Sequence, residues 1–337
     1  MSELRFDPIR RRWTIIATER RLRPHEFAVP RPAEEADVGA CPFEHGSEPA
    51  TPPQIASFPE GADWQVRVVP NKYPAVNHDA PLASESSGLF RRLSGVGSHE
   101  VIVETPQHAR AMADMTPDEI ARVMRVWRGR LLDLGNDSRI RYVLLFKNHG
   151  REAGASLAHP HSQLLATSVV PEFVKDELAS ARAYYRRTKR CIFCDLLEQE
   201  LVREERIVLD NDGFVALSPW AALFPFETWL LPRAHGYDFA LTPDSVLLQL
   251  AAALRELLRR VRAVLADPAF NLILHTAPVP RRSHHPSDVT AHAYHWHFEL
   301  IPRISHIAGF EWGSGYAINH TTPEEAARYL RNVPTLP

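Results

Sequence analysis

The chain is poor in cysteine. Its 337 residues include only Cys41, Cys191 and Cys194, whereas a disulfide framework uses an even set of cysteines. Two of the three form a close C-x-x-C pair, which outside small secreted domains is more typical of metal binding. We therefore expect a reducing environment and a cytoplasmic location.

Long apolar runs and an excess of charge are also absent. No run approaches the roughly 20 apolar residues that span a bilayer, and the N-terminal sequence MSELRFDPIRRRW lacks the apolar core of a signal peptide. Lysine and arginine number 39 against 41 acidic residues, which gives a net charge of −2. This balance provides no electrostatic field for nucleic acid or for an anionic membrane. We expect neither as a partner.

Length and composition indicate a globular protein of one large domain or two ordinary ones. Hydrophobic residues make up 45% of the chain, enough for a sizeable core, and 28 prolines favour a fold with many loops. Residues 82–98 are rich in serine and glycine, and we expect them to form a mobile, irregular segment.

The most informative stretch is NHGREAGASLAHPHSQ, residues 148–163. His159 and His161 stand two apart, so in a strand both would project to one face, and the proline between them favours a strand end or sheet edge. A loop of small residues, here including Ser156, can wrap a phosphate with its backbone N–H groups. A neighbouring imidazole can act as nucleophile, and Gln163 offers an amide donor. An isolated H-x-H is often a pair of structural histidines, so this interpretation depends on the rest of the chain.

The two halves of the chain carry the same features in the same order. Each has a Thr-Pro-Asp sequence that predicts the start of a long helix, and Thr242 follows Thr116 by 126 residues. An apolar strand and an H-x-H strand follow in both halves. We interpret the chain as a duplicated α+β unit, an antiparallel sheet with a long helix packed on it, over residues 1–170 and again over 171–337.

Each half also groups four potential metal ligands: Cys41, Glu44, His108 and His159 in the first, and Cys191, Cys194, His235 and His295 in the second. A close pair followed by two distant imidazoles is typical of tetrahedral zinc. The second set has two thiolates, whereas Glu44 replaces a thiolate in the first and predicts a weaker site. We expect one or two structural zinc ions whose closed coordination leaves no position for substrate.

Seven segments together match a known family. They are DPIRRRWTIIATERRLRP (7–24), CPFE (41–44), RVVPNKYP (67–74), FKNHGREAGASLAHPHSQ (146–163), PFETWLLPRAH (225–235), YHWHFELIPR (294–303) and GFEWGSG (309–315). On these motifs the chain resembles galactose-1-phosphate uridylyltransferase of the histidine-triad superfamily. The resemblance implies a homodimer of two half-barrel-like units that acts on a UDP-sugar and a sugar-1-phosphate.

The resemblance also implies a double displacement. His161 matches the nucleophile that attacks the α-phosphorus of UDP-glucose and releases glucose-1-phosphate; galactose-1-phosphate then accepts the uridylyl group. Gln163 matches the residue that stabilises the phosphoryl oxygens. Further contacts to phosphate, nucleotide or sugar are implied at Ser156, Arg20, Arg23, Asn71, Asn148, Phe310 and Glu311.

Several alternatives stay open at this point. Some relatives build the second metal site, which can hold iron, from one glutamate and three histidines, and the matching residues here are Glu177, His275, His295 and His297. The scaffold also resembles ADP-glucose phosphorylase and, more distantly, dinucleoside tetraphosphate phosphorylase, which share the nucleotidyl-histidine step. A non-catalytic nucleotide-binding protein is a further possibility, which the intact HPHSQ sequence disfavours.

Overall fold

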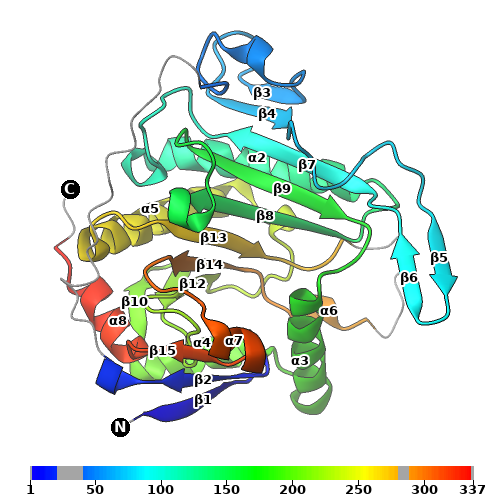
Figure 1. The fold of residues 1–337 in the computed structure, drawn as a ribbon. Coiled ribbons are helices and arrows are strands. Elements are labelled where there is room, and N and C mark those ends of the chain that lie inside the picture. The colour runs from blue at the N-terminus through cyan, green and yellow to red at the C-terminus, as the bar shows by residue number, and fades with distance from the viewer. Residues whose placement is uncertain (1, 21–40, 280–287, 335–337) are drawn as a thin grey trace.

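A single antiparallel sheet of ten strands forms the centre of the molecule (Figure 1). The structure, a computed structural model, describes residues 2–20, 41–279 and 288–334. From one edge to the other the strands are β3 (Ala56–Phe58), β4 (Val66–Pro70), β7 (Gly97–Val103), β9 (His161–Thr167), β8 (Tyr142–His149), β13 (Phe270–His275), β14 (His297–Pro302), β12 (Thr228–Pro232), β11 (Phe214–Leu217) and β10 (Ile207–Asp210).

The strand order is symmetrical about the central β8–β13 pair. β9 and β14 flank this pair, then β7 and β12, then β4 and β11, with β3 and β10 at the two edges. Strands of the first half therefore occupy one side of the sheet and strands of the second half the other, which confirms the predicted α+β fold. The sequence did not indicate that the two sheets are joined: β8 and β13 pair from Phe146↔Ile273 to His149↔Phe270. The described strands form no closed barrel.

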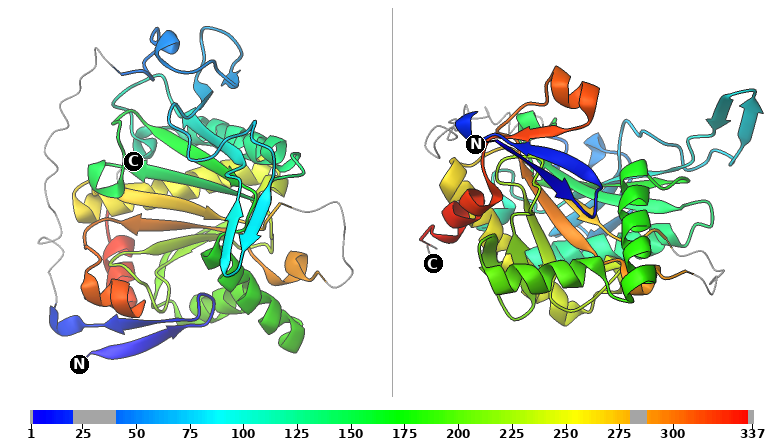
Figure 2. Two further views of the ribbon diagram at one scale, coloured as in Figure 1. Left: turned by 45° about the vertical axis from the view of Figure 1, so that its right-hand side comes forward. Right: turned by 90° about the horizontal axis from the view of Figure 1, so that it is seen from below.

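Two long helices cover one face of the sheet and pack against each other (Figure 2). They are α2 (Pro117–Gly135) and α5 (Asp244–Leu265), and both begin at the predicted Thr-Pro-Asp sequences. In α2, Thr116 Oγ1 accepts from Glu119 N, and the Glu119 carboxylate accepts from Thr116 N at 2.7 Å, which completes a capping box. Trp127 of α2 anchors the sheet by donating to Ser162 Oγ at 2.7 Å.

The other face of the second half carries a separate layer. The N-terminal hairpin of β1 (Glu3–Asp7) and β2 (Arg12–Ile16) pairs with β15 (Ala317–Asn319), and α7 (Gly309–Ser314) lies on the same side of the sheet (Figure 2). Buried Ile9 of this hairpin belongs to a core cluster with Trp229 of β12.

The remaining elements connect or flank these layers. They are α3 (Glu172–Thr188), α4 (Ile192–Arg203), α6 (Thr290–Ala293), α8 (Pro323–Arg331) and the short turns η1 (Thr18–Arg20), η2 (Glu48–Ala50), η3 (Met112–Asp114), η4 (Arg151–Ala153) and η5 (Phe239–Leu241). Among the helices of the described segments, none combines the length and the apolar character that crossing a bilayer requires.

The segment 82–98, expected to be irregular, contains a regular hairpin instead. β5 (Ser84–Ser87) pairs with β6 (Phe90–Leu93), and the ribbon projects from the body of the protein (Figures 1 and 2). All its strand residues are exposed. The serine-rich composition predicted a loop because the segment has no apolar residues spaced to form a buried face. Backbone hydrogen bonds between the two strands can form a hairpin without such a face.

Candidate active site

The loop between β8 and β9 folds back on itself over the sheet. Its short turn η4 is flanked by Gly150 with φ 84° and Gly154 with φ 90°, backbone conformations that glycine adopts without the steric cost of a side chain. The glycines of the NHGREAGAS sequence thus serve the return of the chain toward β9, whose first residue is His161.

A pocket of about 330 Å³ opens beside this loop. Its walls include four of the residues expected at the site: Asn71, Ser156, His161 and Gln163. Phe43 and Tyr73 add aromatic surface. A volume of this size with a few convergent polar groups is typical of a small-molecule site.

His161 is held as a neutral imidazole with one free nitrogen. Its Nδ1 lies 2.7 Å from the carbonyl oxygen of His159; because a carbonyl only accepts, Nδ1 carries the hydrogen and Nε2 keeps its lone pair. Burial, assisted by the nearby Lys147 ammonium, lowers the pKa of His161 to about 4. At neutral pH the imidazole is therefore uncharged, with its hydrogen on Nδ1, and can act as a nucleophile through Nε2.

The amide of Gln163 is oriented by two neighbours. Ala75 N donates to His99 Nδ1, so the other ring nitrogen of His99 carries a hydrogen, which it donates to Gln163 Oε1 at 2.9 Å. Asn71 Nδ2 donates to the same oxygen at 3.3 Å. The NH₂ group of Gln163 is thereby left for a ligand oxygen. The sequence did not single out His99, because no motif marks it.

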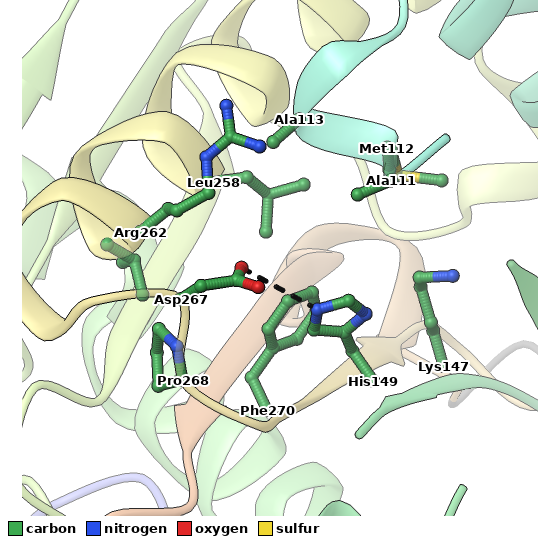
Figure 3. Close-up of a pocket in the computed structure, with 11 residues that line it drawn as sticks. Ala111, Met112, Ala113, Lys147, His149, Leu258, Arg262, Asp267, Pro268 and Phe270 are labelled. Atoms are coloured by element: carbon green, nitrogen blue, oxygen red, sulfur yellow. Dashed lines mark ion pairs between the residues drawn. The ribbon is translucent and has the colours of Figure 1, made fainter. Parts of the chain in front are cut away.

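The backbone of the nucleophile rests on a buried ion pair. Pairing between β8 and β9 ends at Phe146↔Gln163, and beyond that point Lys147 Nζ donates to the His161 carbonyl at 3.2 Å and to Glu104 Oε2 at 2.7 Å. The Lys147 and Glu104 side chains are 3% and 0% exposed. Figure 3 shows Lys147 beside a water-sized pocket of about 20 Å³ on the α5 side of the strand.

Three further residues expected at the site, Asn148, Phe310 and Glu311, are not among those that line this pocket. Asn148 lies near the end of β8, and Phe310 and Glu311 stand on α7. Arg20 ends η1, and Arg23 lies outside the described residues. Glu311 lines a different cavity of about 590 Å³. Within one chain, α7 and His161 therefore do not line the same pocket.

The first metal-ligand set converges as expected. Ligand atoms of Cys41, Glu44, His108 and His159 all lie within 4.8 Å of one another. The Nε2 of His159 donates to the Thr105 carbonyl at 2.8 Å, which turns Nδ1 toward the cluster. Glu44 Oε1 lies only 2.6 Å from His108 Nδ1, closer than the roughly 3.5 Å that separates two ligands of one tetrahedral zinc.

The second set converges with better spacing. Cys194 Sγ lies 3.4 Å from His235 Nδ1 and 3.6 Å from His295 Nδ1, which matches the roughly 3.5 Å of tetrahedral zinc. Carbonyl oxygens of Ala291 and Pro232 accept from the Nε2 atoms of these two histidines. With Cys191 completing the group, both clusters have the donor atoms to hold a metal ion.

The alternative set for the second site is divided. Glu177, His275 and His297 form a group of their own, whereas His295 joins the cysteines. His275 donates to both Glu177 and Glu299, at 3.2 and 2.9 Å. Burial alone would lower the pKa of His275, but the two carboxylates outweigh it and raise that pKa to about 10.

The H-x-H of the second half has a different environment: Arg10, His275 and Glu299 line the cavity of about 590 Å³, but His297 itself does not. His297 Nδ1 approaches the His295 carbonyl at 3.1 Å, as His161 does with His159. The His297 side chain is 0% exposed, however. Glu299 occupies the place of Gln163 and binds Arg10, which the N-terminal hairpin inserts against this face.

The fold and the pocket define an α+β protein in which the strand that begins at His161 lines a small-molecule pocket beside a glycine-rich loop. The chain belongs to the galactose-1-phosphate uridyl transferase family: the family model of the N-terminal domain matches residues 1–171 and that of the C-terminal domain matches residues 177–336. The resemblance seen in the sequence motifs is thereby confirmed.

The chain is similar to relatives with two different names. ADP-glucose phosphorylase of Arabidopsis thaliana is 32% identical, over 98% of this chain and 93% of that protein. Galactose-1-phosphate uridylyltransferase of Thermotoga maritima is 30% identical, over 98% of each. Among solved structures, the Arabidopsis ADP-glucose phosphorylase with bound ADP-glucose has a TM-score of 0.84 at 28% identity, covering 99% of this chain and all of that one. A uridylyltransferase has a TM-score of 0.75 at 29% identity, covering 98% and 97%.

The Lys147–Glu104 pair leads to a stability prediction. The substitution Lys147→Met should lower the free energy of unfolding by about 3 kcal/mol, because it leaves Glu104 buried without its cation. Urea denaturation followed by circular dichroism measures the change. The double variant Lys147→Met/Glu104→Met removes both charges and should lose less than the single variant. A single variant as stable as the wild type would contradict the assignment.

Proposed function

We propose that the protein transfers a nucleoside monophosphate from a nucleoside diphosphate-glucose to an acceptor phosphate, through a covalent intermediate on His161. The observation that supports this most directly is the hydrogen bond from His161 Nδ1 to the His159 carbonyl. It leaves Nε2 of a neutral ring for the pocket that Gln163, Asn71 and Ser156 also line.

The chemistry follows from these groups. The Nε2 lone pair attacks the α-phosphorus, an N–P bond forms, and the P–O bond to glucose-1-phosphate breaks. The ring then carries positive charge, which the His159 carbonyl stabilises through Nδ1–H, while the Gln163 amide donates to the phosphoryl oxygens. An oxygen of the acceptor phosphate attacks the same phosphorus, and the N–P bond breaks to restore the neutral imidazole.

Two donors are supported by different observations. The sequence motifs favour UDP-glucose, with galactose-1-phosphate as the acceptor, and the Thermotoga relative carries the uridylyltransferase name. The higher TM-score of the Arabidopsis structure with bound ADP-glucose supports ADP-glucose, with inorganic phosphate as the acceptor. Both donors require the same histidine and the same pocket.

We further propose that the protein works as a homodimer in which a second copy brings α7 to the His161 pocket. Phe310 and Trp312 of α7 are 49% and 78% exposed, and Glu311 does not line the pocket of its own chain. A symmetric pair of chains would place each α7 against the partner's pocket and expose neither.

The two converging ligand sets are proposed as structural zinc sites, the Cys191 and Cys194 site being the stronger. Zinc there would fix α4 and the segment that leads from His295 into β14. In the first half it would fix His159, two residues before the nucleophile. Neither set leaves a position for substrate, so the residues of the pocket carry the chemistry.

The covalent step predicts a nucleotide-sized mass increase. Incubation of the pure protein with UDP-glucose or with ADP-glucose should give a UMP or an AMP adduct in intact mass spectrometry. The variant His161→Asn should form no adduct, because it removes the nucleophile and leaves the other pocket residues and the metal-ligand sets in place. A UMP adduct identifies the uridylyl reaction and an AMP adduct the adenylyl reaction. The absence of an adduct and of turnover with both donors would contradict the proposal.

Sharing of α7 between subunits predicts complementation. Glu311→Ala and His161→Asn should each be impaired alone, because each lacks one part of the site. When the two variants are mixed after reversible dissociation, some dimers contain one complete site, and activity should exceed that of either parent. A monomeric mass by light scattering, or a mixture no more active than its parents, would refute the shared site.

The donor sets predict where metal is lost. Cys194→Ser should reduce the zinc content measured by inductively coupled plasma mass spectrometry, because it removes one of two thiolates. Glu177→Gln provides the matched control: Glu177 is committed to His275 and to the Tyr294 hydroxyl, so zinc content should be unchanged. Loss of metal in the control and not in Cys194→Ser would reverse the assignment.

A further inference from the structure

We propose that Asn271, from the second half of the chain, is a positioning residue for nucleotidyl transfer at His161. It would hold the amide of Asn148 and the glycine-rich loop of the first half in the geometry that the donor meets. This role rests on the proposed function, and neither the sequence motifs nor the family resemblance points to Asn271.

Register places Asn271 on the face of the sheet that carries the nucleophile. His161 and Gln163 share one face because they stand two apart in β9. Phe146 lies opposite Gln163, so Asn148, two residues further along β8, shares this face as well. Asn271 lies directly opposite Asn148 in the β8–β13 pair, and cross-strand neighbours project to the same side.

Both N–H groups of the Asn271 side chain donate to residues of the first half. Its Nδ2 donates to Asn148 Oδ1 at 2.8 Å and to the Ala153 carbonyl at 2.9 Å. An amide nitrogen has two hydrogens, so the two bonds occupy both. One amide therefore ties the end of β8 to the turn η4, between Gly150 and Gly154.

These bonds determine what Asn148 can offer a ligand. Because the Asn148 oxygen accepts from Asn271, its NH₂ group remains as the donor. That nitrogen lies beside the loop: a Cβ built on Gly154 would come within 3.6 Å of Asn148 Nδ2. Asn148 thus presents an oriented N–H group next to the turn that leads to Ser156. Phosphate or ribose oxygens of the nucleotide sugar would bind there.

Asn211 provides a contrast, because its side chain acts locally: its Oδ1 accepts from Gly213 N and Phe214 N and closes its own turn. Asn271 instead bonds two groups that are more than one hundred residues away, Asn148 near the end of β8 and Ala153 in the loop beside the pocket. Its replacement should act through Asn148 rather than through the core.

A double-mutant cycle tests this coupling. Asn271→Ala and Asn148→Ala should each slow nucleotidylation of His161 by roughly tenfold, since each removes an oriented hydrogen bond. The combined variant should be clearly less impaired than the product of the two single effects, because both changes remove the same bond. The rate is read by quenched single-turnover mass spectrometry with whichever donor labels the wild type.

Asn211→Ala is the matched control, a same-type substitution in the second half at a turn far from the pocket. It should combine with Asn148→Ala multiplicatively and leave the rate close to that of Asn148→Ala alone. Asn271→Asp keeps the size of the side chain but replaces the donor with a carboxylate that faces two oxygens, and it should be at least as slow as Asn271→Ala. Strictly multiplicative behaviour of Asn271→Ala and Asn148→Ala would overturn the proposal.

The outcome is separable from that of the proposed function. If the wild type forms no adduct with either donor, covalent transfer fails as a function, and the same cycle is then run on the dissociation constants of AMP and UMP. Coupling between Asn271 and Asn148 in binding would still support the positioning role. Independent effects in binding would overturn it, whatever the fate of the covalent step.

Discussion

The antiparallel pairing of β8 with β13 is the contact on which the rest of the arrangement depends. It merges two duplicated units into one sheet and sets Asn148 opposite Asn271. The same junction lets α2 and α5 pack side by side and share one core cluster. The sheet's inner strands are thereby paired on both sides, which leaves only the short β3 and β10 as edges, a favourable solution to the exposure of unpaired backbone groups.

Duplication produced two similar halves, but electrostatics separates their roles. In the first half the residue two positions after the second histidine of H-x-H is Gln163, an uncharged amide that lines the pocket. In the second half the corresponding residue is Glu299, which accepts a hydrogen bond from Arg10 of the N-terminal hairpin; Arg10 also donates to Glu227. A buried carboxylate requires such a partner, so the insertion of the hairpin compensates the charge of Glu299 in the second half. The uncharged Gln163 of the first half needs no such partner.

Spacing along the sequence predicted those features that depend on residues close together in the chain. The capped helix at Thr116 and the grouping of cysteines with histidines follow from spacing along the chain, and the strands and helices confirm the α+β fold. The H-x-H lies at a strand end as expected, but β9 begins at His161, so His159 stands before the strand and not in it. The joining of the sheets could not be foreseen, because it depends on pairing between strands that are more than one hundred residues apart. The contacts of His99 with Gln163 and of Lys147 with the His161 carbonyl also depend on how neighbouring strands pair. No motif marks His99, and Lys147 lies within a family motif that does not indicate this contact. Placement of Glu311 away from the pocket of its own chain likewise depends on how separate layers meet.

Five imidazoles, those of His159, His161, His235, His295 and His297, are each oriented by a main-chain oxygen. The carbonyls concerned belong to Thr105, His159, Pro232, Ala291 and His295. A main-chain oxygen is present whichever amino acid occupies the position, so point mutation at these sites cannot delete the acceptor that selects the tautomer. The protonation pattern is therefore inherited with the course of the backbone, and lineages can drift in sequence around these histidines while each ring keeps the same nitrogen available.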